Sequence, residues 1–170
     1  MEPRFTAPGC DVNYLTRFSP PARVVGQIGA GGICAVGIVD VTRLKRFGLF
    51  DGLSHSDLVF IAENCSEMTV ASGSILIREG QVGRDIYLLE EGSVRVFRGD
   101  LNSPREIAVL QSPTIVGELA LLDSARIRTS SVSALSELRL LSIPISTFLV
   151  FVGAYPSVKE KLRQVIATRR

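Results

Sequence analysis

The sequence has no tryptophan, a single histidine and only three cysteines, and these shortages exclude several kinds of site. Cys10, Cys34 and Cys65 lie far apart and form no Cys-x-x-Cys pair, so neither a disulfide framework nor a Cys/His metal site is expected. Histidine-based general-base catalysis would depend on His55, which we expect to cap a helix or lie on the surface. Unpaired cysteines suit a reducing compartment, and we predict a cytoplasmic protein without a cofactor or metal.

Net charge is also small. The 170 residues carry a formal net charge of +2, so no overall attraction to nucleic acid is expected. Hydrophobic residues make up 46% of the chain, enough for a core, although only 6% of residues are aromatic. Residues 159–170 are locally basic, with five positive charges against one negative, and we interpret them as the solvated end of a helix.

A hydrophobic run long enough to span a membrane is missing as well. Residues 24–39 carry no charge, but they include five glycines and fall short of the ~20 residues that a spanning helix needs. A dinucleotide-binding Gly-x-Gly-x-x-Gly would start at Gly29, but Cys34 occupies the position of the third glycine. We expect residues 1–43 to be a partly disordered extension whose apolar part packs on the domain or a partner; membrane association is the less favoured alternative.

From residue 44 onward the pattern is typical of a folded domain. Residues 44–65 predict a short helix, a turn and a second helix that Ser54 or Ser56 caps. Short runs of period two follow, separated by glycine-containing turns. These predicted strands are residues 68–70, 74–79, 85–91, 93–98, 106–110, 130–135 and 138–143.

Helical periodicity returns after Pro144, with a break at residues 153–156. The final helix places apolar residues on one stripe, namely Val158, Leu162, Val165 and Ile166. The order helix pair, short strands, helices predicts a mainly β domain over residues 44–170, with helices at both ends and its strands in a sandwich, jelly roll or small barrel.

The strand pattern is interrupted once, in residues 114–132, TIVGELALLDSARIRTSSV. Residues 117–122 can form one helical turn, whose first N–H groups suit an anion. Arg128 can give a two-pronged hydrogen bond to phosphate, and an ionised Glu118 can accept one from a sugar hydroxyl. Gly117 and Ala120 leave room for close backbone approach. These residues indicate a small sugar-phosphate ligand; an internal Glu118–Arg128 ion pair is the structural alternative.

The same stretch resembles the cyclic nucleotide-binding domain family. The phosphate-binding cassette of that family has the form FGELAL, a variable gap, then R-[AST]-A-x-V, similar to VGELAL at residues 116–121 and RTSSV at 128–132. LFDGLS at residues 49–54 resembles the family's lead-in, and the glycine spacing in residues 73–97 is also similar. The resemblance covers roughly residues 44–167 and implies an antiparallel jelly roll or β-roll with an N-terminal helix pair and C-terminal helices.

The resemblance also implies roles for individual residues. Glu118 should bind the ribose 2′-OH and Arg128 the cyclic phosphate. The other expected pocket residues are Gly117, Leu119, Ala120, Thr129 and Ser130.

The cassette departs from the family pattern at a few positions. Val116 stands where phenylalanine is common, and Ser130 replaces the common alanine, adding a hydroxyl to a tight site. The proline often found before the arginine is missing. Arg126 is a rival for the phosphate role, but the residues after it fit the pattern less well.

The function implied by the resemblance is that of a non-enzymatic regulatory domain that binds a cyclic nucleotide and repositions its C-terminal helices. Cyclic AMP is favoured over cyclic GMP only as the commoner ligand of the family, and Thr129 is compatible with both. The alternative is a vestigial, ligand-free domain used for protein contacts. About fourteen residues follow Pro156, too few for a helix-turn-helix, so we expect output through a protein partner or a homo-oligomer and no direct DNA binding.

Overall fold

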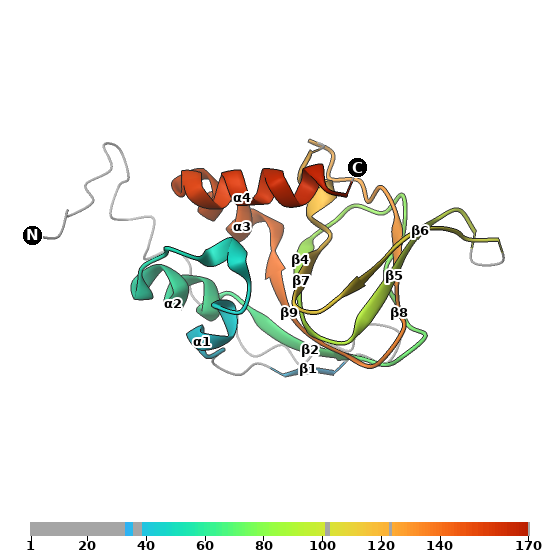
Figure 1. Cartoon of the computed structure of the whole chain (residues 1–170), viewed down its shortest axis with the longest axis horizontal. Helices are drawn as coiled ribbons and strands as arrows, with labels where there is room; N and C mark the ends of the chain where they lie inside the picture. Colours follow the sequence, from blue (N-terminus) through green and yellow to red (C-terminus); the bar gives the residue numbers. More distant parts are fainter. Residues whose placement is uncertain (1–32, 36–38, 101–102, 123, 170) are drawn as a thin grey trace, which may run out of the picture.

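The computed structural model describes residues 33–35, 39–100, 103–122 and 124–169. The strands wrap into a roll on one side of the molecule, and the helices gather on the other (Figure 1). No helix among the described residues is both long and apolar enough to cross a membrane. Most of the apolar stretch 24–39 lies outside the described residues, as do residues 1–23.

Two antiparallel sheets make up the roll, with strand orders β1-β2-β9-β4-β7 and β3-β8-β5-β6. The mainly β fold predicted from the sequence is confirmed, and each predicted run coincides with a strand. The strands β1 and β7 were not predicted, because β1 lies in the expected extension 1–43 and β7 lies at the start of the stretch interpreted as an interruption of the strand pattern. The strands of the described residues are β1 (Ile33–Ala35), β2 (Ser66–Val70), β3 (Ile75–Ile77), β4 (Asp85–Glu91), β5 (Ser93–Arg98), β6 (Arg105–Gln111), β7 (Thr114–Val116), β8 (Ser131–Ala134) and β9 (Leu138–Pro144).

Helices precede, interrupt and follow the roll. They are α1 (Val41–Leu44), the 3₁₀ turn η2 (Gly48–Phe50), α2 (His55–Glu63), the 3₁₀ turn η3 (Glu118–Leu122), α3 (Ile145–Ala154) and α4 (Pro156–Ala167). Ser54, not Ser56, caps α2, through a capping box in which Ser54 and Asp57 each accept from the other's backbone N–H. His55 is the exposed first residue of that helix.

The packed structure begins before the boundary that we expected at residue 44. The backbone of β1 pairs antiparallel with β2, and Val39 is buried in the core. Arg43 of α1 donates from Nε to a Glu90 carboxylate oxygen at 2.8 Å and also pairs with Glu67. These contacts tie α1 to β4 and β2, so part of the segment 1–43 belongs to the domain.

The C-terminal helices contact both the roll and the N-terminal region: α3 packs against β9 and β4, and α4 packs against η2 and η3. The predicted break is at Tyr155, which ends α3, begins α4 and donates its hydroxyl to the Asp57 carboxylate of α2. On α4, Val158, Leu162 and Ile166 are buried, as the apolar stripe predicted. The far end of α4 reaches η3, which places the C-terminal residues beside the roll (Figure 1).

Candidate ligand-binding site

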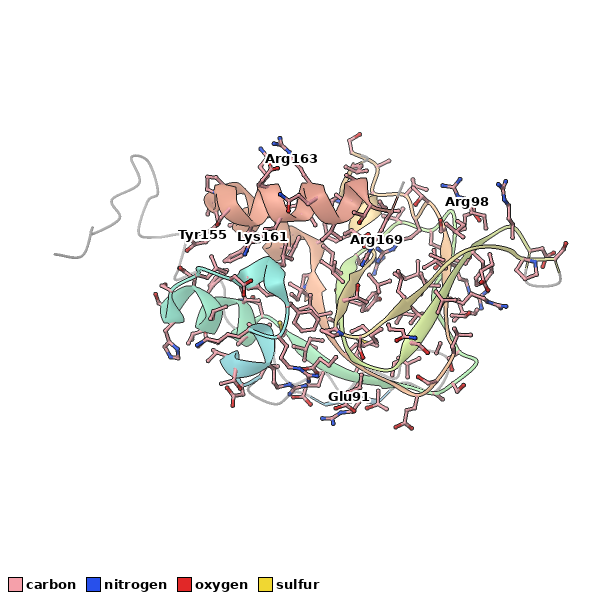
Figure 2. The ribbon with its side chains drawn as sticks, viewed as in Figure 1. Glu91, Arg98, Tyr155, Lys161, Arg163 and Arg169 are labelled. Carbon is pink, nitrogen blue, oxygen red and sulfur yellow. The ribbon has the colours of Figure 1, made fainter. Side chains whose placement is uncertain are left out.

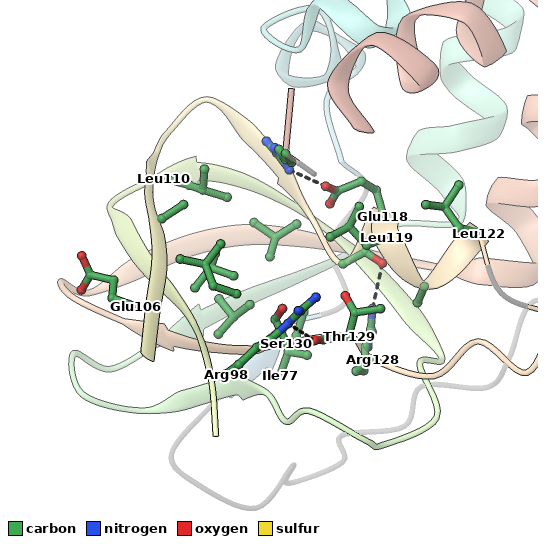
Figure 3. Close-up of a pocket in the computed structure, with 18 of the residues that line it drawn as sticks. Ile77, Arg98, Glu106, Leu110, Glu118, Leu119, Leu122, Arg128, Thr129 and Ser130 are labelled. Atoms are coloured by element: carbon green, nitrogen blue, oxygen red, sulfur yellow. Dashed lines mark hydrogen bonds and ion pairs between the residues drawn. The ribbon is translucent and has the colours of Figure 1, made fainter. Parts of the chain in front are cut away.

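A cavity of about 820 Å³ opens in the roll beneath the end of α4. All seven residues that the sequence assigned to a ligand site line it, although they come from two separate segments (Figure 3). These residues are Gly117, Glu118, Leu119, Ala120, Arg128, Thr129 and Ser130.

Arg128 is held in a fixed position at the base of this cavity. Its side chain lies just before β8, the residue is only 6% exposed, and its guanidinium donates to the Asp85 carbonyl at 2.6 Å and the Gly117 carbonyl at 2.9 Å. Burial lowers the pKa of Arg128 from its ordinary value, while Tyr87, Asp85 and Glu118 oppose that shift. Arginine remains protonated in proteins, so the cavity contains a preorganised cation.

Two glycines make room for the Arg128 side chain. A Cβ atom on Gly83 would lie 2.8 Å from the guanidinium carbon, and one on Gly117 would lie 2.5 Å from Nη1. Gly117 also has a φ of +91°, a conformation that disfavours other residues. The close approach expected at Gly117 is therefore made by Arg128. Gly83, interpreted from sequence as an ordinary turn residue, is a positioning residue for the same side chain.

Glu118 is the first residue of η3 and is only 2% exposed. Its carboxylate does not pair with Arg128, the alternative that the sequence left open, but with Arg169, whose Nη1 lies 2.8 Å from Oε1. Arg169 also donates to the Ile115 carbonyl and the Thr114 hydroxyl. A buried carboxylate is thus stabilised by a cation from the end of the chain.

Arg169 corrects the prediction that residues 159–170 are a solvated helix end. Its side chain is only 17% exposed and lines the cavity. A signal for this was present in the sequence, because Arg169 follows Ile166 by three residues and so continues the buried stripe of α4. The interpretation rested on the net basic charge of the whole segment and so overlooked Arg169, whose side chain points inward.

Arg126, the rival for the phosphate role, does not line the cavity. It adopts a positive φ of 55°, and its carbonyl accepts a hydrogen bond from the Gly83 amide at 2.8 Å. Its role in the structure is therefore local, in the loop that delivers Arg128.

The rim of the cavity includes a further arginine, Arg98, at the end of β5. Its Nε donates to the Thr129 carbonyl at 3.0 Å, which holds its head group beside Thr129 and Ser130 (Figure 3). From the sequence, Arg98 was only the last residue of the predicted strand 93–98. Its return toward the cavity depends on the loop that carries Thr129, which no local pattern reveals.

The lining of the cavity combines charge with an apolar wall. Four arginines and two glutamates line it, so the balance favours an anion. The charged residues are Arg98, Arg105, Glu106, Glu118, Arg128 and Arg169. Apolar side chains from β5, β6 and η3 provide a surface on which a flat ring can pack. They are Val96, Ala108, Leu110, Leu119 and Leu122. Among the described residues, no group of His, Cys, Asp or Glu is arranged to hold a metal ion.

Comparison with known proteins gives a consistent result. A family model described as "Cyclic nucleotide-binding domain" matches residues 67–155, more than half of the chain. The CRP-like cAMP-activated global transcriptional regulator of Mycobacterium tuberculosis is 25% identical over 127 residues, which are 74% of this chain and 56% of that protein. A cAMP-dependent protein kinase regulatory subunit of Pyricularia oryzae is 29% identical over 120 residues, 71% of this chain and 30% of that protein.

Solved structures show the same fold. The catabolite activator protein of Thermus thermophilus superimposes with a TM-score of 0.60 at 28% identity, over 71% of this chain and 57% of that one. The match with the curated relatives spans only about half or a third of their length.

Proposed function

Because the chain belongs to the cyclic nucleotide-binding domain family, we propose that its cavity binds a 3′,5′-cyclic mononucleotide and that the chain is a non-enzymatic regulatory domain. One observation carries the proposal. The cavity places a buried guanidinium, Arg128, and a buried carboxylate, Glu118, in one space with an apolar wall.

Each part of the ligand has a matching group. Arg128 offers a charge-assisted donor to the cyclic phosphate, and Gly117, Leu119 and Ala120 bring backbone amides to the same space. Arg169 binds one oxygen of Glu118, and a carboxylate has about four acceptor positions, so capacity remains for the ribose 2′-OH. The apolar wall is available to the base.

The regulatory part of the proposal concerns α4. Arg169 lies just beyond the end of that helix and shares the Glu118 carboxylate with the ribose site. A ligand that binds Glu118 therefore changes the contacts of the C-terminal residues. If α4 has two arrangements, such a ligand shifts the equilibrium between them by the difference in its binding free energy for each.

Cyclic AMP is the first candidate ligand. The names of the M. tuberculosis regulator and of the P. oryzae kinase subunit both specify cAMP. Cyclic GMP is the second candidate, because Thr129 and Arg98 stand together at the rim. A guanidinium bonds well to O6 and N7 of guanine, whereas adenine presents an amino donor at the corresponding position.

We expect Thr129→Ala to separate these possibilities. Thr129 lines the cavity and is exposed to it. One neutral hydrogen bond contributes about 0.5–1.5 kcal/mol, or roughly a 2- to 13-fold change in affinity. If Thr129 forms a hydrogen bond with guanine, titration of the variant will show a loss of affinity for cyclic GMP alone. An equal loss for both nucleotides would mean that it only holds the phosphate.

The output of the domain is proposed to pass through a protein partner or a homo-oligomer. The relatives named above include a transcriptional regulator and a kinase subunit, so the family serves different outputs. The second candidate function is the vestigial domain, which would keep the fold without binding a nucleotide.

Thermal unfolding in the presence of ligand tests the proposal. A ligand that binds only the folded state adds about 2.7 kcal/mol of stability at 100 times its Kd. We expect cyclic AMP to raise the Tm, and linear 5′-AMP, whose phosphate has a different shape and charge, to raise it much less. Equal shifts with both would indicate non-specific anion binding, and no shift would favour the vestigial domain.

A further inference from the structure

A second cavity, of about 470 Å³, lies on the other side of Arg169. It is bounded by η2, β7 and α4, and Arg169 lines both this cavity and the first one. The residues that line it are Arg46, Phe47, Gly48, Leu49, Leu88, Pro113, Thr114, Ile115, Lys161, Gln164, Val165 and Arg169. This described lining includes three cations and no carboxylate.

Of the three cations, Arg46 has the weakest contact with the protein, whereas Lys161 and Arg169 supply charge but already donate to protein oxygens. Arg46 is exposed, and its Nη2 lies 3.4 Å from the Glu90 carbonyl, longer than an ordinary hydrogen bond. Lys161 donates to the carbonyls of Gly48 at 2.7 Å and Asp51 at 3.1 Å, and the Asp51 carboxylate is 3.6 Å from Nζ. Asp51 thus offsets part of one charge, and the cavity remains cationic. Lys161 lies on the side of α4 that faces η2 (Figure 2).

The remaining lining is largely apolar, formed by Phe47, Leu49, Leu88, Ile115 and Val165. A small cavity with an apolar wall and a few convergent polar groups is the usual form of a small-molecule site. The polar groups here are cationic. An amphipathic anion, such as a carboxylate with a short apolar chain, matches both the charge and the wall.

We propose that this cavity is a second ligand site, for a small amphipathic carboxylate, and that its occupant and the cyclic nucleotide weaken each other's binding across Arg169. The binding part stands on the cavity alone. The coupling part rests on the proposed function of the first cavity.

The sign of the coupling follows from charge. Arg169 already pairs with Glu118, so an anion on its other side competes for the same guanidinium. The nucleotide brings a phosphate into the adjoining cavity, and two anions on either side of one guanidinium repel each other. The coupling is reciprocal, since each ligand must change the affinity of the other by the same factor.

Calorimetric titration of the full chain with sodium octanoate tests the binding part. Octan-1-ol, with the same chain and no charge, and inorganic phosphate, with charge and no chain, serve as probe controls. We expect saturable octanoate binding and at least about 10-fold weaker binding of both controls. Failure of octanoate to bind at millimolar concentration, or equal binding of octan-1-ol, overturns the proposal.

Matched variants assign the probe to this cavity. Arg46→Gln removes a lining charge, and Gln164→Glu adds a negative one; both residues are exposed, so folding should be preserved. Each should weaken octanoate binding by about 2- to 5-fold. Arg163→Gln is the control, because Arg163 points away from the body of the protein and pairs with Glu160 (Figure 2). An equal effect of Arg46→Gln and Arg163→Gln contradicts the assignment.

Repeating the cyclic AMP titration with saturating octanoate tests the coupling. We expect the Kd of cyclic AMP to rise about 5-fold or more, and the Kd of octanoate to rise by the same factor with saturating cyclic AMP. An unchanged Kd overturns the coupling but not the site. If cyclic AMP fails to bind without octanoate, the proposed function fails, and the octanoate result with its variants still decides the second site.

Discussion

Replacing Arg128 with alanine is expected to weaken cyclic AMP binding by roughly 10- to 150-fold. The guanidinium is buried and fixed by the carbonyls of Asp85 and Gly117, so it meets the phosphate without further ordering. A hydrogen bond to a charged group contributes about 1.5–3 kcal/mol, which converts to that range of affinity. Isothermal titration of the variant and the wild type measures the loss.

The control for this experiment is Arg126→Ala. Arg126 lies two residues away and carries the same charge, but it does not line the cavity. Its replacement should leave the Kd within about 2-fold of the wild-type value. If Arg126→Ala abolishes binding and Arg128→Ala does not, the register of the cassette is wrong by two residues.

Arg128→Lys separates the charge from the geometry. Lysine keeps the charge but cannot reproduce the planar fork. The Asp85 and Gly117 carbonyls would also lose partners, so thermal unfolding without ligand must accompany the titration. A variant that folds normally and still loses affinity assigns the effect to the ligand.

Replacing Glu118 with glutamine is expected to weaken binding by a similar factor, roughly 10- to 150-fold. The change neutralises the proposed acceptor of the ribose 2′-OH and leaves Arg169, which is largely buried, without its ionic partner. Because both changes alter the site, the loss alone does not identify the contact.

A second ligand isolates the contact. The wild type should bind 2′-deoxy cyclic AMP much less tightly than cyclic AMP, whereas Glu118→Gln should discriminate far less between them. Such a cycle cancels effects that do not involve the hydroxyl. A variant that discriminates as strongly as the wild type would show that Glu118 does not contact the 2′-OH and acts only through Arg169.

The parts of the fold that were predictable are those that depend on residues close together in the sequence. Period-two runs predicted the long strands such as β4 and β5, and the buried stripe of α4 followed from helical spacing. By contrast, β1 and β7 were not predicted, and each pairs with a strand distant in the sequence, β1 with β2 and β7 with β4. That pairing is a tertiary property, which residue patterns do not contain.

The same distinction applies to the candidate site. The seven predicted residues stand in two short motifs, so they could be named together from the sequence, and all of them line the cavity. Arg169 and Gly83 were missed because their roles depend on long-range contacts: one reaches Glu118 from the end of the chain, and the other leaves space for Arg128. The roles of such residues can be recognised only once the folded structure is known.

The central claim is that this cavity holds a cyclic nucleotide, and isothermal titration of the full chain with cyclic AMP tests it most directly. The arrangement of Glu118 and Arg128 in one cavity predicts saturable binding with one nucleotide per chain. Absence of both binding heat and a thermal shift up to millimolar cyclic AMP and cyclic GMP would contradict it, and would leave a domain that has the family's fold without its ligand.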